Sequence, residues 1–119
     1  IRSGSVDSIL TSIKKLLGIA EDYTHFDDDI IIHINSAFSS LNQLGVGPSY
    51  GFHIEDDSET WSDFFGESSE LYDVRTYIYL KVSLWFDPPT SSAVLSAKER
   101  QISELEWRLN VAAEQESNS

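Results

Sequence analysis

The sequence predicts an all-α domain, a compact bundle of four longer helices and one short helix. Three observations lead to this fold class. Apolar residues recur at three- and four-residue intervals over long stretches of the 119-residue chain. Glycine and proline lie mostly between those stretches. There are no cysteines, and hydrophobic residues make up 40% of the chain, so a packed core rather than disulfides must stabilise it.

The first predicted helix covers about residues 7–17. Its apolar residues follow the helical spacing, and Gly18 offers a left-handed stop after it. Lys14 and Lys15 fall in the last turn, where the helix dipole favours cations.

The second predicted helix covers residues 27–44 and has the clearest start. Asp27 is the expected N-cap, and two more aspartates follow it in the first turn. Phe26 and Ile31 have the spacing of a hydrophobic staple. Three consecutive isoleucines could also indicate a strand, but the helical spacing continues beyond them and favours a helix.

A loop rich in glycine is expected at residues 45–57, with room for a short extended segment that folds back on the helices. A short helix follows at residues 59–65, and Ser58 is its expected cap. The aromatic residues Trp61 and Phe64 lie on one side of this helix, together with Phe65.

The last two predicted helices cover residues 69–86 and 91–113. The first of them has a broad apolar face, which implies burial against more than one neighbour. Pro88 and Pro89 separate the two helices, because proline cannot continue one. In the second, Glu104 and Arg108 are spaced as an i,i+4 ion pair.

These elements suggest a single helical domain at residues 6–113. Residues 1–5 are expected to be a flexible start or an engineered remnant, and residues 114–119 a polar, frayed tail. No run of apolar residues is long enough to cross a membrane, so no membrane partner is expected.

The charge distribution is uneven. The formal net charge is -12, and no Lys or Arg lies between Lys15 and Arg75, whereas thirteen Asp and Glu do. Such a field repels nucleic acid and attracts basic protein surfaces. Five basic residues belong to the last two helices, so copies arranged head-to-tail could set a basic side against an acidic side. Ordinary solvated helix faces explain the same pattern.

The sequence contains few features of a catalytic or metal-binding site. The aspartates at residues 27–29 lack the alternating ligands and glycine of a calcium loop. The three histidines are too scattered to form a metal motif, and neither a nucleophile elbow nor a phosphate loop is present. No enzyme activity, cofactor or metal is therefore expected.

The aromatic residues allow two interpretations. Trp61 and Phe64 are either core residues or part of a contact patch with a neighbouring chain. Trp107 lies off the apolar stripe of the last helix, which is compatible with a partner contact and with packing inside the chain.

The order of several short motifs resembles a known family. The motifs are Phe26-Asp27-Asp28-Asp29-Ile30, Leu44-Gly45-Val46-Gly47-Pro48, Trp61-Ser62-Asp63-Phe64, Phe86-Asp87-Pro88-Pro89 and Glu104-Leu105-Glu106-Trp107-Arg108-Leu109. Together they are similar to the small helical head–tail connector (adaptor) proteins of tailed bacteriophages, over residues 6–113.

The resemblance implies a structural virion protein, made in the bacterial host cytoplasm. It implies a homo-oligomeric ring, commonly a dodecamer, that extends the DNA channel between the portal protein and the stopper or tail-completion protein. DNA would pass through without specific binding, which acidic walls would favour. The helix at residues 91–113 would then lie at the portal, and the loop at residues 45–57 toward the next ring or the tail.

Candidate contact residues follow from this resemblance and from the charge pattern. Portal or subunit contacts are expected at Arg100, Trp107, Arg108, Trp61 and Phe64. A surface toward the channel or a basic partner is expected at Asp56, Asp57 and Asp63. Two other functions remain open for so acidic a chain: a DNA-mimicking inhibitor and a helical adaptor of some basic protein.

Overall fold

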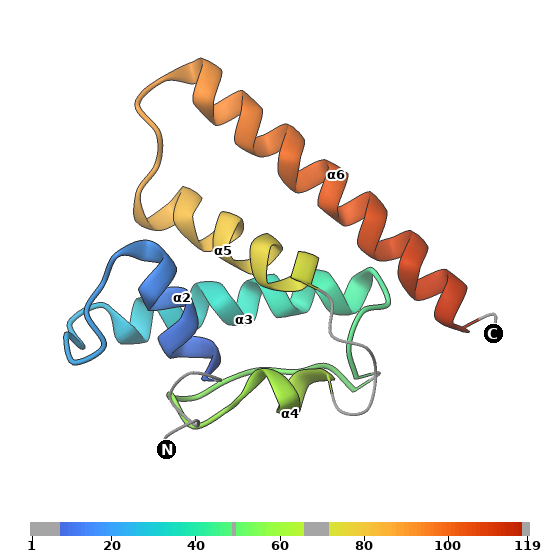
Figure 1. The fold of residues 1–119 in the computed structure, drawn as a ribbon, viewed down its shortest axis with the longest axis horizontal. Coiled ribbons are helices and arrows are strands. Elements are labelled where there is room, and N and C mark those ends of the chain that lie inside the picture. Colours follow the sequence, from blue (N-terminus) through green and yellow to red (C-terminus); the bar gives the residue numbers. More distant parts are fainter. Residues whose placement is uncertain (1–7, 49, 66–71, 118–119) are drawn as a thin grey trace.

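The computed structural model describes residues 8–48, 50–65 and 72–117. The helices of these residues are α2 (Ile9–Leu17), α3 (Asp27–Gln43), α4 (Trp61–Phe65), α5 (Tyr72–Phe86) and α6 (Ser92–Ser117) (Figure 1). The described residues form no strand, and their one bridge of strand type joins Ser8 to Thr60. The predicted all-α bundle is therefore confirmed.

Helix α5 is the centre of the bundle. It packs against α2, α3 and α6, and in Figure 1 it lies between α3 and α6. Its side chains are buried on nearly every side because three helices surround it, as the broad apolar face predicts. The buried residues of α5 are Val74, Tyr77, Ile78, Leu80, Val82 and Ser83.

The ends of α2 agree with the sequence. Ser8 is the N-cap, and its Oγ accepts a hydrogen bond from the Thr11 backbone N–H at 3.2 Å. Gly18 ends the helix in the left-handed region, at φ 83°. The predicted start at residue 7 lies outside the described residues.

Lys14 does more than complement the helix dipole. Its side chain is only 3% exposed, and its Nζ donates to the backbone carbonyls of Glu21 at 3.0 Å and Tyr23 at 2.8 Å. The same Nζ lies 2.9 Å from Asp27 Oδ1, in an ion pair. One buried cation thus holds the α2–α3 connection and the start of α3 together.

The start of α3 differs from the prediction. The helix begins at Asp27 itself, so the N-cap position belongs to Phe26, which makes no side-chain capping hydrogen bond. Asp27 was the expected N-cap, but its carboxylate faces the Lys14 ammonium instead. Phe26 packs against Phe86 at the end of α5, with ring centroids 5.2 Å apart.

Amide side chains of α3 fix the following loop to that helix, and Asn35 makes two of the hydrogen bonds. Asn35 Nδ2 donates to the Ile54 carbonyl at 2.9 Å, and Asn35 Oδ1 accepts from the Ile54 N–H at 2.7 Å. These two hydrogen bonds join Asn35 to the Ile54 backbone as neighbouring β-strands are joined, and they place the Ile54 side chain in the core. Gly47 approaches Phe64 so closely that a Cβ there would lie 2.6 Å from the ring. The described part of the loop folds back as expected, but without a strand.

The cap of α4 also differs from the prediction. The Asp63 N–H donates to Thr60 Oγ1 at 3.1 Å, and the Thr60 N–H donates to Asp63 Oδ2 at 3.0 Å. This reciprocal pair is a capping box, and it satisfies two backbone donors at once. Ser58, the expected cap, instead donates to Asp56. The helix accordingly starts at Trp61, two residues later than expected.

Helix α6 continues to Ser117, beyond the expected end at Ala113. Side-chain hydrogen bonds help to fix it to the rest of the bundle. Tyr77 Oη donates to Glu106 Oε2 at 2.8 Å, and Asn110 Nδ2 donates to the Leu44 carbonyl at 3.0 Å. Burial, and then this hydrogen bond, raise the pKa of Tyr77 far above its usual value.

Candidate interaction surfaces

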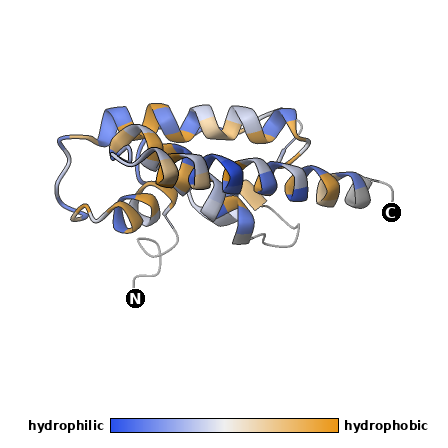
Figure 2. Cartoon of the chain, turned by 90° about the horizontal axis from the view of Figure 1, so that it is seen from above, coloured by the Kyte–Doolittle hydropathy of each residue, from blue (hydrophilic) through white to orange (hydrophobic). Residues whose placement is uncertain are grey.

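Helix α6 has one side in the core and one side in solvent. Ile102, Leu105 and Leu109 are buried against the bundle. Trp107 and Arg100 are seven residues apart, so they share a face, and helical geometry places that face opposite the buried stripe. Trp107 is 67% exposed. Hydrophilic residues cover much of α6, with hydrophobic ones at intervals (Figure 2).

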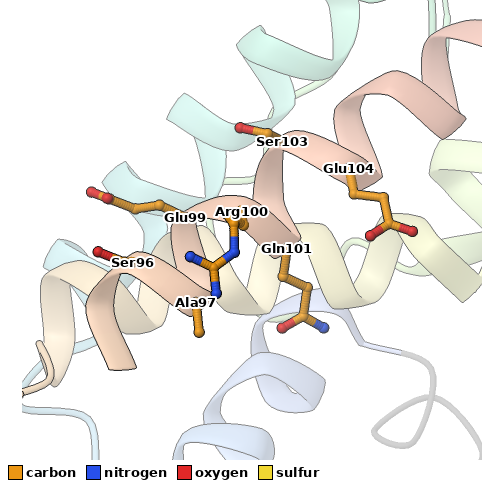
Figure 3. Close-up of a pocket in the computed structure, with 7 residues that line it drawn as sticks. All are labelled: Ser96, Ala97, Glu99, Arg100, Gln101, Ser103 and Glu104. Atoms are coloured by element: carbon orange, nitrogen blue, oxygen red, sulfur yellow. The ribbon is translucent and has the colours of Figure 1, made fainter. Parts of the chain in front are cut away.

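The first half of α6 is an open surface. The residues Ser96, Ala97, Glu99, Arg100, Gln101, Ser103 and Glu104 surround a wide, shallow hollow. All seven side chains come from this one helix and spread from it in several directions (Figure 3). Such a surface does not enclose a small ligand, but it leaves Arg100 accessible to another protein.

Arg108 is placed differently from Arg100. Its Nη2 lies 3.8 Å from Asp73 Oδ1 of α5, so its ion pair runs to a neighbouring helix and not to Glu104 as expected. Both side chains are over 40% exposed, and such surface pairs contribute little to stability. Arg108 therefore remains within reach of a partner.

Trp61 and Phe64 are core residues. They are 1% and 3% exposed, and Phe64 packs against Phe38 and Phe52. Of the two roles left open for them, core packing is the one observed. Helix α4 is too short to be stable alone, so its aromatic residues must anchor it to the bundle.

The acidic segment around α4 is on the surface. Asp56, Asp57 and Asp63 are all exposed. Asp56 Oδ1 accepts hydrogen bonds from the Ser58 N–H at 2.8 Å and the Ser58 hydroxyl at 2.6 Å, which lowers the pKa of that carboxyl. Asp63 belongs to the capping box described above. Much of this negative charge therefore also shapes the local backbone.

A groove that sequence patterns did not indicate lies between α2, α4 and α5. It has a volume of about 420 Å³, and its lining residues are Thr11, Ser12, Lys15, Leu16, Glu21, Trp61 and Arg75. Lys15 and Arg75, which bound the stretch without basic residues in the sequence, thus line the same groove. No local pattern reveals the groove, since its residues come from separate elements.

The histidines do not form a metal site with other residues that the structure describes. His33 stacks on Trp85 with ring centroids 4.0 Å apart, and His53 Nε2 lies 3.7 Å from a carboxylate oxygen of Glu55. Within the described residues, no group of three or more His, Asp or Glu could hold a metal ion.

A family model described as phage connector protein matches residues 9–116. The chain belongs to this family. Membership indicates a structural role in joining phage head and tail, and a place in the virion. Neither the curated proteins nor the solved structures give a significant match. In the part of this connector protein that the structure describes, no helix has the length and apolar character of a membrane span.

Proposed function

We propose that this connector protein forms a ring between the portal and the stopper or tail-completion protein of a tailed phage. The ring, a dodecamer by the family pattern, extends the channel through which DNA leaves the head. The observation that carries the proposal is the family match over residues 9–116, which covers every described helix except the last residue of α6.

The surfaces support a subunit that has neighbours on several sides. The outward face of α6, with Arg100 and Trp107, offers a cation and a large aromatic residue, and such residues are common at the centres of protein interfaces. Arg108 adds a second accessible cation on the same helix. We assign this face of α6 to contacts with the portal or with a second copy.

The acidic segment supports a wall that does not retain DNA. Asp56, Asp57 and Asp63 are exposed, and hydrogen bonds hold the pKa of Asp56 below its usual value. Carboxylates repel phosphates, so DNA would pass such a surface without specific binding. We therefore assign these residues to the channel or to a basic neighbour.

The structure gives less support to a DNA-mimicking inhibitor than to a ring subunit. A mimic requires rows of carboxylates free to meet basic side chains. Here Asp27 faces Lys14, Asp63 caps α4, and Glu59 accepts from the backbone N–H groups of Glu55 at 2.9 Å and Asp56 at 3.3 Å. Several of the acidic groups are thus committed to contacts inside the chain.

The experiment that tests the proposal is co-assembly with the portal protein of the same phage. Native mass spectrometry and electron microscopy should show one closed ring of this chain on each portal. Portal particles that carry no stoichiometric ring would contradict the proposal. A monomer in the absence of the portal is compatible with it, because assembly of such rings can depend on the template.

A further inference from the structure

The groove between α2, α4 and α5 has the features of a docking site. Trp61 lies at its floor, where its Nε1 donates to Ser12 Oγ at 3.1 Å. The guanidinium carbon of Arg75 lies 5.0 Å from the centre of the Trp61 ring. Leu16, 54% exposed, adds apolar surface that its own chain does not cover. The floor is therefore rigid and partly apolar.

Two basic side chains line the groove in this acidic protein. Lys15 and Arg75 line it, and Glu21 is the single acid among its seven lining residues. Only 8 basic residues stand against 20 acidic ones in the whole chain, so two cations at one hollow are a local concentration of basic side chains. Such a site favours an apolar side chain that is accompanied by a carboxylate.

Helix α6 carries that combination on its outward face. Trp107 is the most exposed tryptophan of the described residues, and Glu104, one turn before it, is also exposed. The groove volume of about 420 Å³ lies in the range of pockets that enclose small ligands, roughly 300–1,000 Å³, so an indole fits it. With the Trp107 indole buried in the groove, Glu104 would at the same time pair with Lys15.

The two features cannot meet within one chain. Leu105 and Leu109 hold α6 against the bundle, so Trp107 points away from it. In Figure 1, α2 and α6 lie on different sides of α5. A contact between them must therefore join two copies through two different faces. Repetition of such a head-to-tail contact closes into a ring when the rotation between copies allows it.

We infer that Trp107 and Glu104 of one copy dock into the groove formed by Lys15, Leu16, Trp61 and Arg75 of the next copy. The inference rests on the proposed ring and names the contact that closes it. Lys15 pairs with Glu104, and the Trp107 indole covers Leu16 and the floor of the groove. Tryptophan and arginine are the residue types that most often dominate an interface.

Cross-linking through engineered cysteines tests the contact, because the chain contains no cysteine of its own. The variant Ser103→Cys/Thr11→Cys places one thiol beside Trp107 and one at the groove and leaves the proposed contact residues unchanged. A short bis-maleimide should convert it into a ladder of trimers and larger species. Each single-cysteine variant should give dimers at most. As a matched control, Ser103→Cys/Ser36→Cys has its second thiol on an exposed position of α3 and should give no ladder.

Two pairs of substitutions probe the contact itself. Adding Trp107→Ala to the Ser103→Cys/Thr11→Cys variant should weaken association between copies about tenfold or more. Adding Trp85→Ala should not, because Trp85 is an exposed tryptophan outside both surfaces. Glu104→Lys should reduce the ladder, and Lys15→Glu in the same chain should restore it. A ladder that survives Trp107→Ala, or a charge exchange without rescue, would overturn the inference.

The same reactions, run on the chain alone and with the portal, separate this inference from the proposed function. Portal-bound rings without the ladder would reject the groove contact and retain the ring. A ladder without any portal-bound ring would retain the contact and reject the place at the head–tail junction. Cross-linking of Ser103→Cys to the portal in place of a second copy would assign the Trp107 face to the portal and overturn the inference.

Discussion

Removing the Lys14 ammonium should cost much of the stability of the fold. In Lys14→Met the aliphatic stem is largely kept, but two carbonyls and the Asp27 carboxylate lose the cation that lies 2.8–3.0 Å from them. Breaking a buried ion pair from one side costs about 3–5 kcal/mol. Asp27 is 23% exposed, so water can compensate in part, and we expect about 3 kcal/mol.

Urea unfolding followed by circular dichroism measures this loss. A decrease of about 3 kcal/mol is large against the ~5–15 kcal/mol of a typical domain, and it corresponds to a fall in Tm of about 12 °C at ~4 °C per kcal/mol. Lys15→Met is the matched control: it removes a neighbouring, exposed charge from the same helix end, so any dipole effect is common to both variants.

The double variant Lys14→Met/Asp27→Asn tests the origin of the loss. It removes the carboxylate that the first substitution leaves without its cation, so it should recover about 1 kcal/mol relative to Lys14→Met. If Lys14→Met destabilises the protein no more than Lys15→Met does, the buried ammonium is not what holds the α2–α3 connection, and the reasoning fails.

Three further predictions concern the core and the loop. Tyr77→Phe should lower the free energy of unfolding by about 1–2 kcal/mol at neutral pH. Because folding raises the pKa of Tyr77, the native state retains the proton, so stability is full below pH 10 and falls above it by up to about 1.4 kcal/mol per pH unit; pH-dependent unfolding should show that this slope is absent in Tyr77→Phe. Asn35→Ala should cost about 2–3 kcal/mol and speed amide hydrogen exchange of the loop, since both polar groups of the residue 54 backbone lose their partner; unchanged exchange would refute this. Gly47→Ala should be more destabilising in thermal unfolding than Gly18→Ala, because both have positive φ but only Gly47 meets a ring; equal Tm values would contradict the close approach.

The sequence predicts the helices well and their ends less well. The apolar spacing marks every helix of the described residues because burial in the shared core determines which residues must be apolar. Asp27 and Ser58 were expected to cap helices. In the structure, Asp27 has a partner from another helix, and a competing cap takes the place of Ser58. Lys14 attracts the Asp27 carboxylate from another helix, and Asp63 with Thr60 satisfies more donors than Ser58 could.

The candidate surfaces, like the helices, could be predicted from the sequence only in part. Arg100 and Trp107 could be placed outward from the sequence, since the buried stripe of α6 fixes the opposite face. The burial of Trp61 depends on how α4 lies across the bundle, and no spacing within five residues can determine that. The groove is harder still to foresee, because its cations are sixty positions apart in the chain.

The outward face of α6 has a consequence for how this protein can change over evolutionary time. Trp107 and Arg100 contribute nothing to the core, so they can be replaced without unfolding the subunit. The residues that select a neighbour are thereby separated from those that maintain the bundle. A lineage could exchange its assembly partners by substitutions on one helix face, while natural selection for a stable fold acts on the opposite face.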